Sequence, residues 1–465
     1  MKKKHLVVVG VIILSAIVIL GLYQTFALSG DITKDTSGYY NVTITDGTTV
    51  TVPANSTKTV YYKLTNTNKG IVKYGIGYSG TNITAKYYND TQDPVTGTVD
   101  YGKSKYIKLS VQNSGTTSST ATLSTILGYE KGGDLIVPSG VTLVTKMFTE
   151  PLATTLTNLY NNASKTSVTN NSITYNYDTT NNLMKDVGDN IRYYGASPNN
   201  YIYFNCSDYS NQSSSTCETW RIIGVFDGKV KLIRGSQIGS YSWDNKNTST
   251  GTENGYGKND WTDARLMKLL NPGYETATTG GSLYYNAKSG NCYAGQNNAT
   301  KTCNFTSTGI KNDITKNLIS NTTYYLGGHN NFSVHPNQIY GYERGTTVYS
   351  GRPTTWQGKI ALPYPSDYGY AADLGKCSQN LNNYNDSTCT SNNWMKAIVS
   401  PNVGWLLTPR SGIASNAWYV YSSGGVYFNS YAYTAYGVAP VLYLNSELGV
   451  KAGTGTSSDP YQISA

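Results

Sequence analysis

The chain has 465 residues, and only 14% of them are charged, with 36 Lys or Arg against 27 Asp or Glu. Tyr alone occurs 43 times, so the chain has enough large apolar side chains to argue against intrinsic disorder. Three of the nine excess positive charges lie in Lys2, Lys3 and Lys4, and the remainder form no basic stripe, which argues against a nucleic-acid partner.

The N-terminus combines a basic start with an apolar run from residue 6 to residue 23. A helix of this length spans about 27 Å, close to the hydrocarbon core of a bilayer. We predict that residues 1–28 are a signal-anchor held in the cytoplasmic membrane by residues 6–23. A signal peptide cleaved near Ala27 is the alternative. The chain is then a single-pass cell-membrane protein or a secreted one, and in both cases the rest lies outside the cell.

Residues 33–145 contain short segments of alternating apolar and polar residues, such as 39–44 and 58–64, separated by turn signals. This spacing predicts an immunoglobulin-like β-sandwich. The segment contains no Cys, His or Trp, so we interpret it as a stalk.

Residues 146–183 are predicted to be a helix and a linker. A helix is expected over 149–163, where Pro151 suits the first turn and three leucines share one face: Leu152, Leu156 and Leu159. Residues 164–182 are rich in Asn and Thr and are predicted to be the linker.

Residues 184–465 are predicted to be an α+β domain of short strands with helices over 263–270 and 309–321. All seven Trp residues lie in this part of the chain. Trp220 and Arg221 occupy a largely apolar predicted strand, which favours core packing over an exposed stacking platform.

The six cysteines fall into three close pairs within polar loops: Cys206/Cys217, Cys292/Cys303 and Cys377/Cys389. The cysteines could pair in other ways, but the repeated spacing favours the three local disulfides. The short C-x₂₋₄-C spacing of zinc sites is absent, and a reactive thiol is the less favoured alternative.

Seven motifs of the second domain occur in a fixed order, at residues 219–226, 261–271, 342–348, 364–370, 405–409, 437–444 and 453–461. In these motifs the chain resembles a family of exported proteins of Gram-positive gut bacteria (Bacillota). Their C-terminal domain of unknown function is similar to C-type-lectin-like and sulfatase-modifying-factor-like domains. The resemblance covers about 185–463 and implies a C-type-lectin-like fold for 184–465.

Enzymes of the sulfatase-modifying branch use a reactive cysteine pair, whereas each cysteine here has a close partner in its own loop. The sequence also lacks a G-x-S-x-G elbow and an H-E-x-x-H motif. We therefore predict a protein that is not an enzyme and has no cofactor, with structural calcium left open.

The remaining candidates for chemistry are few. His329 and His335 have no carboxylate nearby in the sequence, which favours loop polarity over metal binding. Glu343 and Asp367 lie in motif segments, and Glu343 adjoins Arg344, so we predict a structural ion pair.

The aromatic segment 418–436 gives the strongest functional signal. Ser423-Gly424-Gly425 predicts a hairpin turn, which would place Trp418, Val420, Val426 and Phe428 inside and Tyr419, Tyr421 and Tyr427 outside. Tyr and Asn among small residues supply rigid contact area with adaptable hydrogen bonds. The candidate ligand-binding residues are Trp418, Tyr419, Tyr421, Tyr427, Asn429, Tyr431, Tyr433 and Tyr436. A tyrosine-rich surface without a partner is the alternative.

The sequence therefore predicts a mostly β protein with a membrane helix, a β-sandwich stalk and a lectin-like head. Its expected function is to bind an unknown glycan or protein ligand at the cell surface. A cell-wall or glycan hydrolase and a structural surface component are the alternatives.

Overall fold

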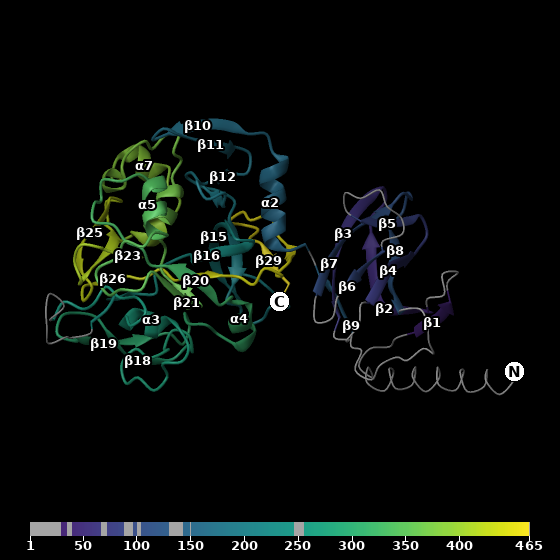
Figure 1. Ribbon diagram of the computed structural model, residues 1–465, viewed down its shortest axis with the longest axis horizontal. Helices are drawn as coiled ribbons and strands as arrows, with labels where there is room; N and C mark the ends of the chain where they lie inside the picture. Colours follow the sequence, from purple (N-terminus) through teal and green to yellow (C-terminus); the bar gives the residue numbers. More distant parts are fainter. Residues whose placement is uncertain are drawn as a thin grey trace, which may run out of the picture. The chain divides into compact units, whose positions relative to one another are not determined.

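A computed structural model describes most of the chain, namely residues 29–34, 40–66, 72–87, 96–99, 104–129, 143–148, 150–245 and 255–464. Strands make up 35% and helices 14%, which confirms the predicted mostly β character. The chain forms two compact units, Met1–Glu150 and Pro151–Ala465 (Figure 1). The predicted membrane segment 6–23 lies outside the described residues. Within the described ranges, no helix is both long and apolar enough for a membrane span.

The first unit consists of two antiparallel sheets. One has the strand order β1 (Ser29–Lys34), β2 (Tyr40–Val52), β8 (Ser119–Tyr129), β4 (Val72–Ser79) and β6 (Thr96–Val99). The other has the order β5 (Ile83–Tyr87), β7 (Ser104–Asn113), β3 (Ser56–Asn66) and β9 (Leu143–Phe148). This β-rich arrangement agrees with the predicted β-sandwich, and the immunoglobulin-like assignment stays a prediction.

Alternation along the strands explains why these residues form a two-sheet core. In β2, Val50 and Val52 are buried while Thr51 between them is exposed. In β7, Leu109 and Val111 are buried, as expected when successive side chains point to opposite faces.

The second unit is built on a nine-stranded antiparallel sheet. Its strands in spatial order are β10 (Thr166–Asn170), β11 (Ile173–Asp178), β12 (Leu183–Lys185), β13 (Ile191–Tyr193), β15 (Glu218–Phe226), β16 (Lys229–Arg234), β27 (Val441–Tyr443) and β22 (Ile360–Ala361), with β14 (Tyr201–Phe204) beside β15.

The second unit also contains a five-stranded sheet. Its strands in order are β17 (Ser240–Ser242), β26 (Ala435–Gly437), β23 (Gly404–Pro409), β24 (Asn416–Val420) and β25 (Val426–Tyr431). Three two-stranded ribbons complete the strands: β18 (Ser289–Tyr293) with β19 (Thr300–Asn304), β20 (Thr322–Tyr325) with β21 (Thr355–Gly358), and β28 (Val450–Ala452) with β29 (Gln462–Ile463).

The helices are short. They are α2 (Leu152–Asn162), α3 (Arg265–Leu270), α4 (Asp313–Leu318), α5 (Pro336–Glu343), α6 (Pro365–Tyr370), α7 (Ser387–Ser391) and α8 (Lys396–Val399), with a 3₁₀ turn at Leu381–Asn383. The predicted helices over 263–270 and 309–321 are confirmed, and both are shorter than expected. Helix α4 starts only after Asn312, whose side chain accepts the Thr315 N–H as an N-cap.

Trp220 and Arg221 are both structural, as predicted. Trp220 is fully buried, and its ring meets Phe204 edge to face at 5.3 Å. The Arg221 guanidinium lies 3.7 Å from the centre of the Tyr201 ring and donates to Asn200. Burial lowers the pKa of Arg221 to about 10.

The predicted linker is wrong, because residues 164–182 form two strands of the large sheet. Asn171 and Ser172 both have positive φ, 46° and 61°, which makes the tight hairpin turn between β10 and β11. Tyr175 and Tyr177 then alternate with polar residues and are buried. The polar composition suggested a linker, but these two tyrosines supply the apolar face of a strand.

Helix α2 also belongs to the second unit, which begins at Pro151 rather than at residue 184. The helix packs against β13, β15 and β16 (Figure 1). Leu156 is fully buried on the face predicted from the leucine spacing, and the Leu152 N–H donates to the Leu448 carbonyl at 2.7 Å.

We predict that Leu156→Ala lowers the free energy of unfolding of the second unit by about 3 kcal/mol, because it leaves a cavity under α2. Leu159→Ala on the same helix is the matched control and should cost about 1 kcal/mol, since Leu159 is only partly buried. Urea denaturation followed by tryptophan fluorescence measures both. Equal losses would show that the face of α2 containing Leu156 is not docked.

Candidate functional site

The hairpin formed by β24 and β25, together with residues up to 436, is called here the tyrosine hairpin. Val420 pairs with Val426 and Tyr419 pairs with Tyr427, which confirms the predicted hairpin. Gly424 in the turn has a φ of +108°, a conformation that favours glycine. The Tyr368 hydroxyl donates to the Gly424 carbonyl at 3.0 Å, so the turn is held by helix α6.

The inner face of the tyrosine hairpin is as predicted. Trp418, Val420, Val426 and Phe428 are all buried, and the Trp418 and Phe428 rings meet at 5.1 Å. Trp418 is fully buried, so its inclusion among the ligand-contacting residues is wrong.

Tyr419 was predicted to point outward, but only 7% of it is exposed. Its hydroxyl donates to Asn429 Oδ1, and burial raises its pKa to about 12. Tyr436 from β26 covers it, with the ring centres 5.3 Å apart. The Tyr436 ring also packs on Trp405 at 4.7 Å, so Tyr419 and Tyr436 are parts of the fold rather than free contact residues.

Besides Tyr431 and Tyr433, three predicted residues remain on the outer side. Tyr421 near the turn is 49% exposed, and Asn429 on β25 is also exposed. Tyr427 is half-buried, because its hydroxyl donates to the Asn382 carbonyl at 3.0 Å and its ring packs against Phe332.

Tyr431 and Tyr433 form a stack with Tyr256, a residue that the sequence did not single out. The Tyr256 ring lies 4.4 Å from Tyr431 and 6.0 Å from Tyr433, with interplanar angles of 27° and 26°. The Tyr433 N–H donates to the Tyr256 carbonyl at 3.1 Å, which fixes the two segments together. Tyr431 is 40% exposed, so part of the stack is open to solvent.

Tyr256 lies between Gly255 and Gly257, and both glycines have positive φ values, 72° and 78°. A side chain on Gly257 would collide with the Asp244 carbonyl oxygen, so this turn requires glycine. The Gly-Tyr-Gly sequence was the signal that could have marked this tyrosine.

The two histidines have separate roles. The His329 ring stacks on Tyr342 at 3.7 Å with a 6° angle, and Tyr342 is 38% exposed. The His335 backbone N–H donates to Gln338 Oε1 at 2.9 Å at the start of α5. Burial lowers the pKa of both imidazoles. Among the residues that the structure describes, no three His, Cys, Asp or Glu side chains form a group that could hold a metal ion.

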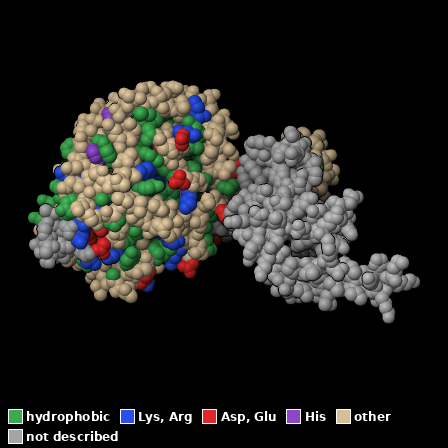
Figure 2. Space-filling view, viewed as in Figure 1, with side chains coloured by type: hydrophobic (Ala, Val, Ile, Leu, Met, Phe, Trp, Pro, Cys, Tyr) green, Lys and Arg blue, Asp and Glu red, His purple; other side chains and the backbone are tan. Residues whose placement is uncertain are grey.

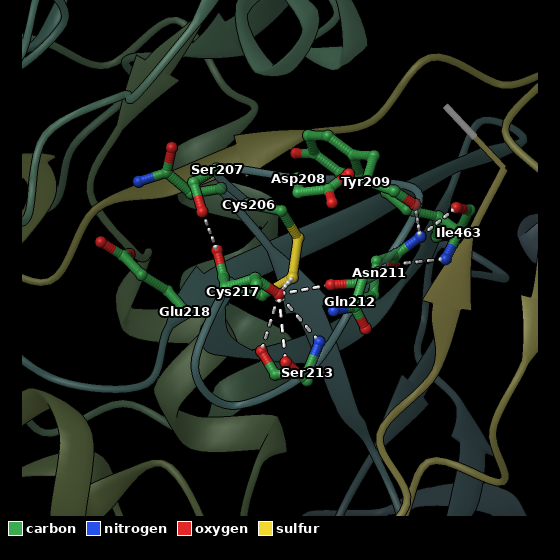
Figure 3. The surroundings of a disulfide bond; sticks show 12 residues. Cys206, Ser207, Asp208, Tyr209, Asn211, Gln212, Ser213, Cys217, Glu218 and Ile463 are labelled. Atoms are coloured by element: carbon green, nitrogen blue, oxygen red, sulfur yellow. Dashed lines mark hydrogen bonds between the residues drawn. A yellow bond between two sulfur atoms is a disulfide. The ribbon is translucent and has the colours of Figure 1, made fainter.

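The three predicted disulfides are confirmed: Cys206–Cys217, Cys292–Cys303 and Cys377–Cys389. Figure 3 shows the first of them inside its loop, where the Gln212 amide donates to the Ile463 carbonyl at 2.6 Å. The Ile463 N–H in turn donates to Gln212 Oε1, so two hydrogen bonds hold strand β29 against this loop. The six cysteines are all paired and act as structural cross-links.

A second group of polar side chains is buried beneath α6 and is called here the buried charge cluster. Arg192 on β13 donates to Asp186 at 2.5 Å and to Asp367 at 2.9 Å. Lys231 on β16 donates to the other oxygen of Asp367 at 2.5 Å. Burial lowers the pKa of Lys231 to about 8.

Glu343 and Arg344 form the predicted structural ion pair, at 3.2 Å. The Glu343 carboxylate also accepts the N–H and the hydroxyl of Ser366, at 2.8 and 2.5 Å. Burial raises the pKa of Glu343 to about 7. Glu343 and Asp367 are enclosed in the core, so neither carboxylate is placed to reach a polysaccharide.

The surface of the second unit carries little charge on the face shown in Figure 2. On the face of the second unit seen in Figure 2, Lys, Arg, Asp and Glu appear as small scattered groups among uncharged side chains. This distribution agrees with the weak charge of the sequence.

Comparison with known proteins gives no support from relatives: no family model matches the chain, and no curated protein matches it either. The resemblance of the second unit to lectin-like domains therefore stays a prediction based on its motifs.

We predict that the stability of the wild-type protein relative to Glu343→Gln falls as the pH rises from about 4.5 to about 7. The folded state holds the Glu343 proton more tightly than the unfolded chain, so this stabilisation is present below pH 4.5 and is lost through pH 7. The difference between the two unfolding free energies should change by about 3 kcal/mol over this range.

Chemical denaturation at several pH values measures this difference. Asp189→Asn is the control, because the Asp189 side chain is 89% exposed and its removal should not alter the pH profile. A Glu343→Gln profile parallel to that of the wild type would contradict the pKa assigned to Glu343.

Proposed function

We propose that this chain is a cell-surface, ligand-binding protein of adhesin or receptor type, and that it is not a catalyst. Residues 6–23 hold it in the membrane, or it is secreted after cleavage near Ala27. The first unit acts as the stalk, and the second unit is a C-type-lectin-like head that binds a glycan or a protein.

The stack of Tyr256, Tyr431 and Tyr433 carries this proposal. Three rings lie within 27° of parallel and are fixed by a backbone hydrogen bond, so their orientation is set before a ligand arrives. A preorganised aromatic surface loses little conformational entropy on binding.

Tyr421 and Asn429 add exposed polar groups elsewhere on the tyrosine hairpin. Tyr421 is the most exposed tyrosine of the tyrosine hairpin, and its phenol offers both an apolar ring and a hydroxyl. Asn429 is exposed and its carbonyl is oriented by the Tyr419 hydroxyl, which leaves its amide group as a donor for a ligand. Ring faces beside amide and hydroxyl groups suit sugar rings and the polar surface of a protein.

The hydrolase alternative receives less support from the geometry. A glycoside hydrolase needs two carboxyl groups flanking an accessible bond. Asp367 is bound by Arg192 and Lys231 in the core, and Glu343 is bound by Ser366 and Arg344.

A glycan and protein array probed with residues 29–465 would identify the ligand, and variants of the stack would then test the surface. Tyr431→Ala and Tyr256→Ala should each weaken ligand capture about tenfold or more. Each substitution removes a stacked ring, and an aromatic ring that stacks on a nucleic-acid base contributes about 1–3 kcal/mol to binding. A loss of about 1.4 kcal/mol corresponds to a tenfold weaker affinity.

Tyr342→Ala is the matched control, because Tyr342 is as exposed as Tyr431 but belongs to helix α5. Unchanged capture by both stack variants, with the fold intact by circular dichroism, would rule out the stack as the binding surface.

A further inference from the structure

An amine and a carboxylate from separate elements meet inside the second unit. Lys231 Nζ on β16 lies 2.5 Å from Asp367 Oδ2 on α6, and neither side chain has any exposed surface. Their sequence positions are 136 residues apart, so the fold alone brings them together. A pair fixed in this way has a high effective concentration for a reaction between its members.

Aromatic rings surround the amine. Lys231 Nζ lies 4.4 Å from the centre of the Tyr364 ring, 5.2 Å from Phe226 and 5.4 Å from Tyr443. Because an apolar surrounding disfavours the ammonium form, burial lowers the pKa of Lys231 to about 8 despite the partner carboxylate. The uncharged amine is the nucleophilic form of lysine.

Hydrogen-bond donors hold the carboxyl group on both oxygens. Arg192 donates to Asp367 Oδ1 at 2.9 Å, and the Tyr364 backbone N–H donates to Oδ2 at 2.9 Å. A guanidinium fixed on Oδ1 stabilises negative charge that develops on this oxygen during attack at the carboxyl carbon. Burial opposes ionisation of Asp367, but Lys231 and Arg192 outweigh it and lower its pKa, so the ion pair is the starting state.

We propose that Lys231 and Asp367 condense to an intramolecular amide, which joins β16 covalently to α6. One ammonium proton passes from Lys231 to Asp367 Oδ2, and the amine then attacks the Asp367 carboxyl carbon. A second proton moves from the nitrogen to Oδ2, the bond from carbon to Oδ2 breaks, and one water leaves. Asp367 Oδ1 remains as the amide oxygen and keeps its hydrogen bond from Arg192. The step is a condensation that needs no oxidant or co-reactant.

The charges around the pair allow this change. Asp186, Asp367 and Glu343 face Arg192, Lys231 and Arg344 in one connected region of the core. Condensation removes one positive and one negative charge together, so the remaining buried groups stay balanced. It also removes two charges that are costly to keep away from water.

The mass of the full chain tests the proposal. After reduction and denaturation, the protein should be lighter than its sequence by the mass of one water. Trypsin should release a branched peptide in which residues 230–234 are joined to residues 360–376 through Lys231 and Asp367. The full sequence mass, or recovery of both segments only as linear peptides, would overturn the proposal.

Two controls locate the loss. Asp227-Gly228 can lose water by forming a succinimide, but it lies on a different tryptic peptide, so a loss found there alone overturns the proposal. Lys268 and Asp263 form an ion pair of similar length, 2.6 Å, whose side chains are 24% and 35% exposed. This pair should stay linear, and equal cross-linking of both pairs would show an artefact of preparation.

Lys231→Arg keeps the positive charge but cannot form the amide, so this variant should have the full sequence mass. The measurement on the wild-type chain stands whether or not the variant folds. It is also independent of ligand capture, so it can fail or succeed separately from the proposed function.

Discussion

The contact on which the second unit depends most is that of Asp367 with Arg192 and Lys231. Asp367 lies in α6, while its two cationic partners come from β13 and β16 of the large sheet. Removing one member of such a buried set would leave an uncompensated charge in the core, so the helix and the sheet are held to one relative position. The Tyr364 N–H completes the set by fixing the carboxylate at the start of α6.

Tyr368, the residue after Asp367, links α6 to the surface of the second unit. The Tyr368 side chain reaches the turn of the tyrosine hairpin and donates to the Gly424 carbonyl. The position of the tyrosine hairpin therefore depends on the buried charge cluster. The orientation of its exposed tyrosines is fixed in the same way. A binding surface that is rigid before contact is the physical basis of the proposed function.

Much of the fold was predictable wherever the determining contacts are local. The three disulfides close short loops, so their spacing in the sequence was sufficient evidence. The hairpin followed from a Ser-Gly-Gly turn between alternating residues, and its inner face was assigned correctly. The strands of 164–182 were missed because Asn and Thr dominate the composition, while the decisive Tyr175 and Tyr177 are buried only through contacts with distant residues such as Tyr370 and Leu374.

The candidate site was predictable only in part. The sequence by itself determined the weakly charged surface, the paired cysteines and the crowding of tyrosines near the C-terminus, since these are properties of composition and short-range spacing. Only the tertiary structure decided that Tyr419 is covered by Tyr436 and that Tyr431 stacks on Tyr256, a residue 175 positions earlier. Exposure and stacking depend on which distant segment lies on each face, and periodicity within one strand carries no information about that segment.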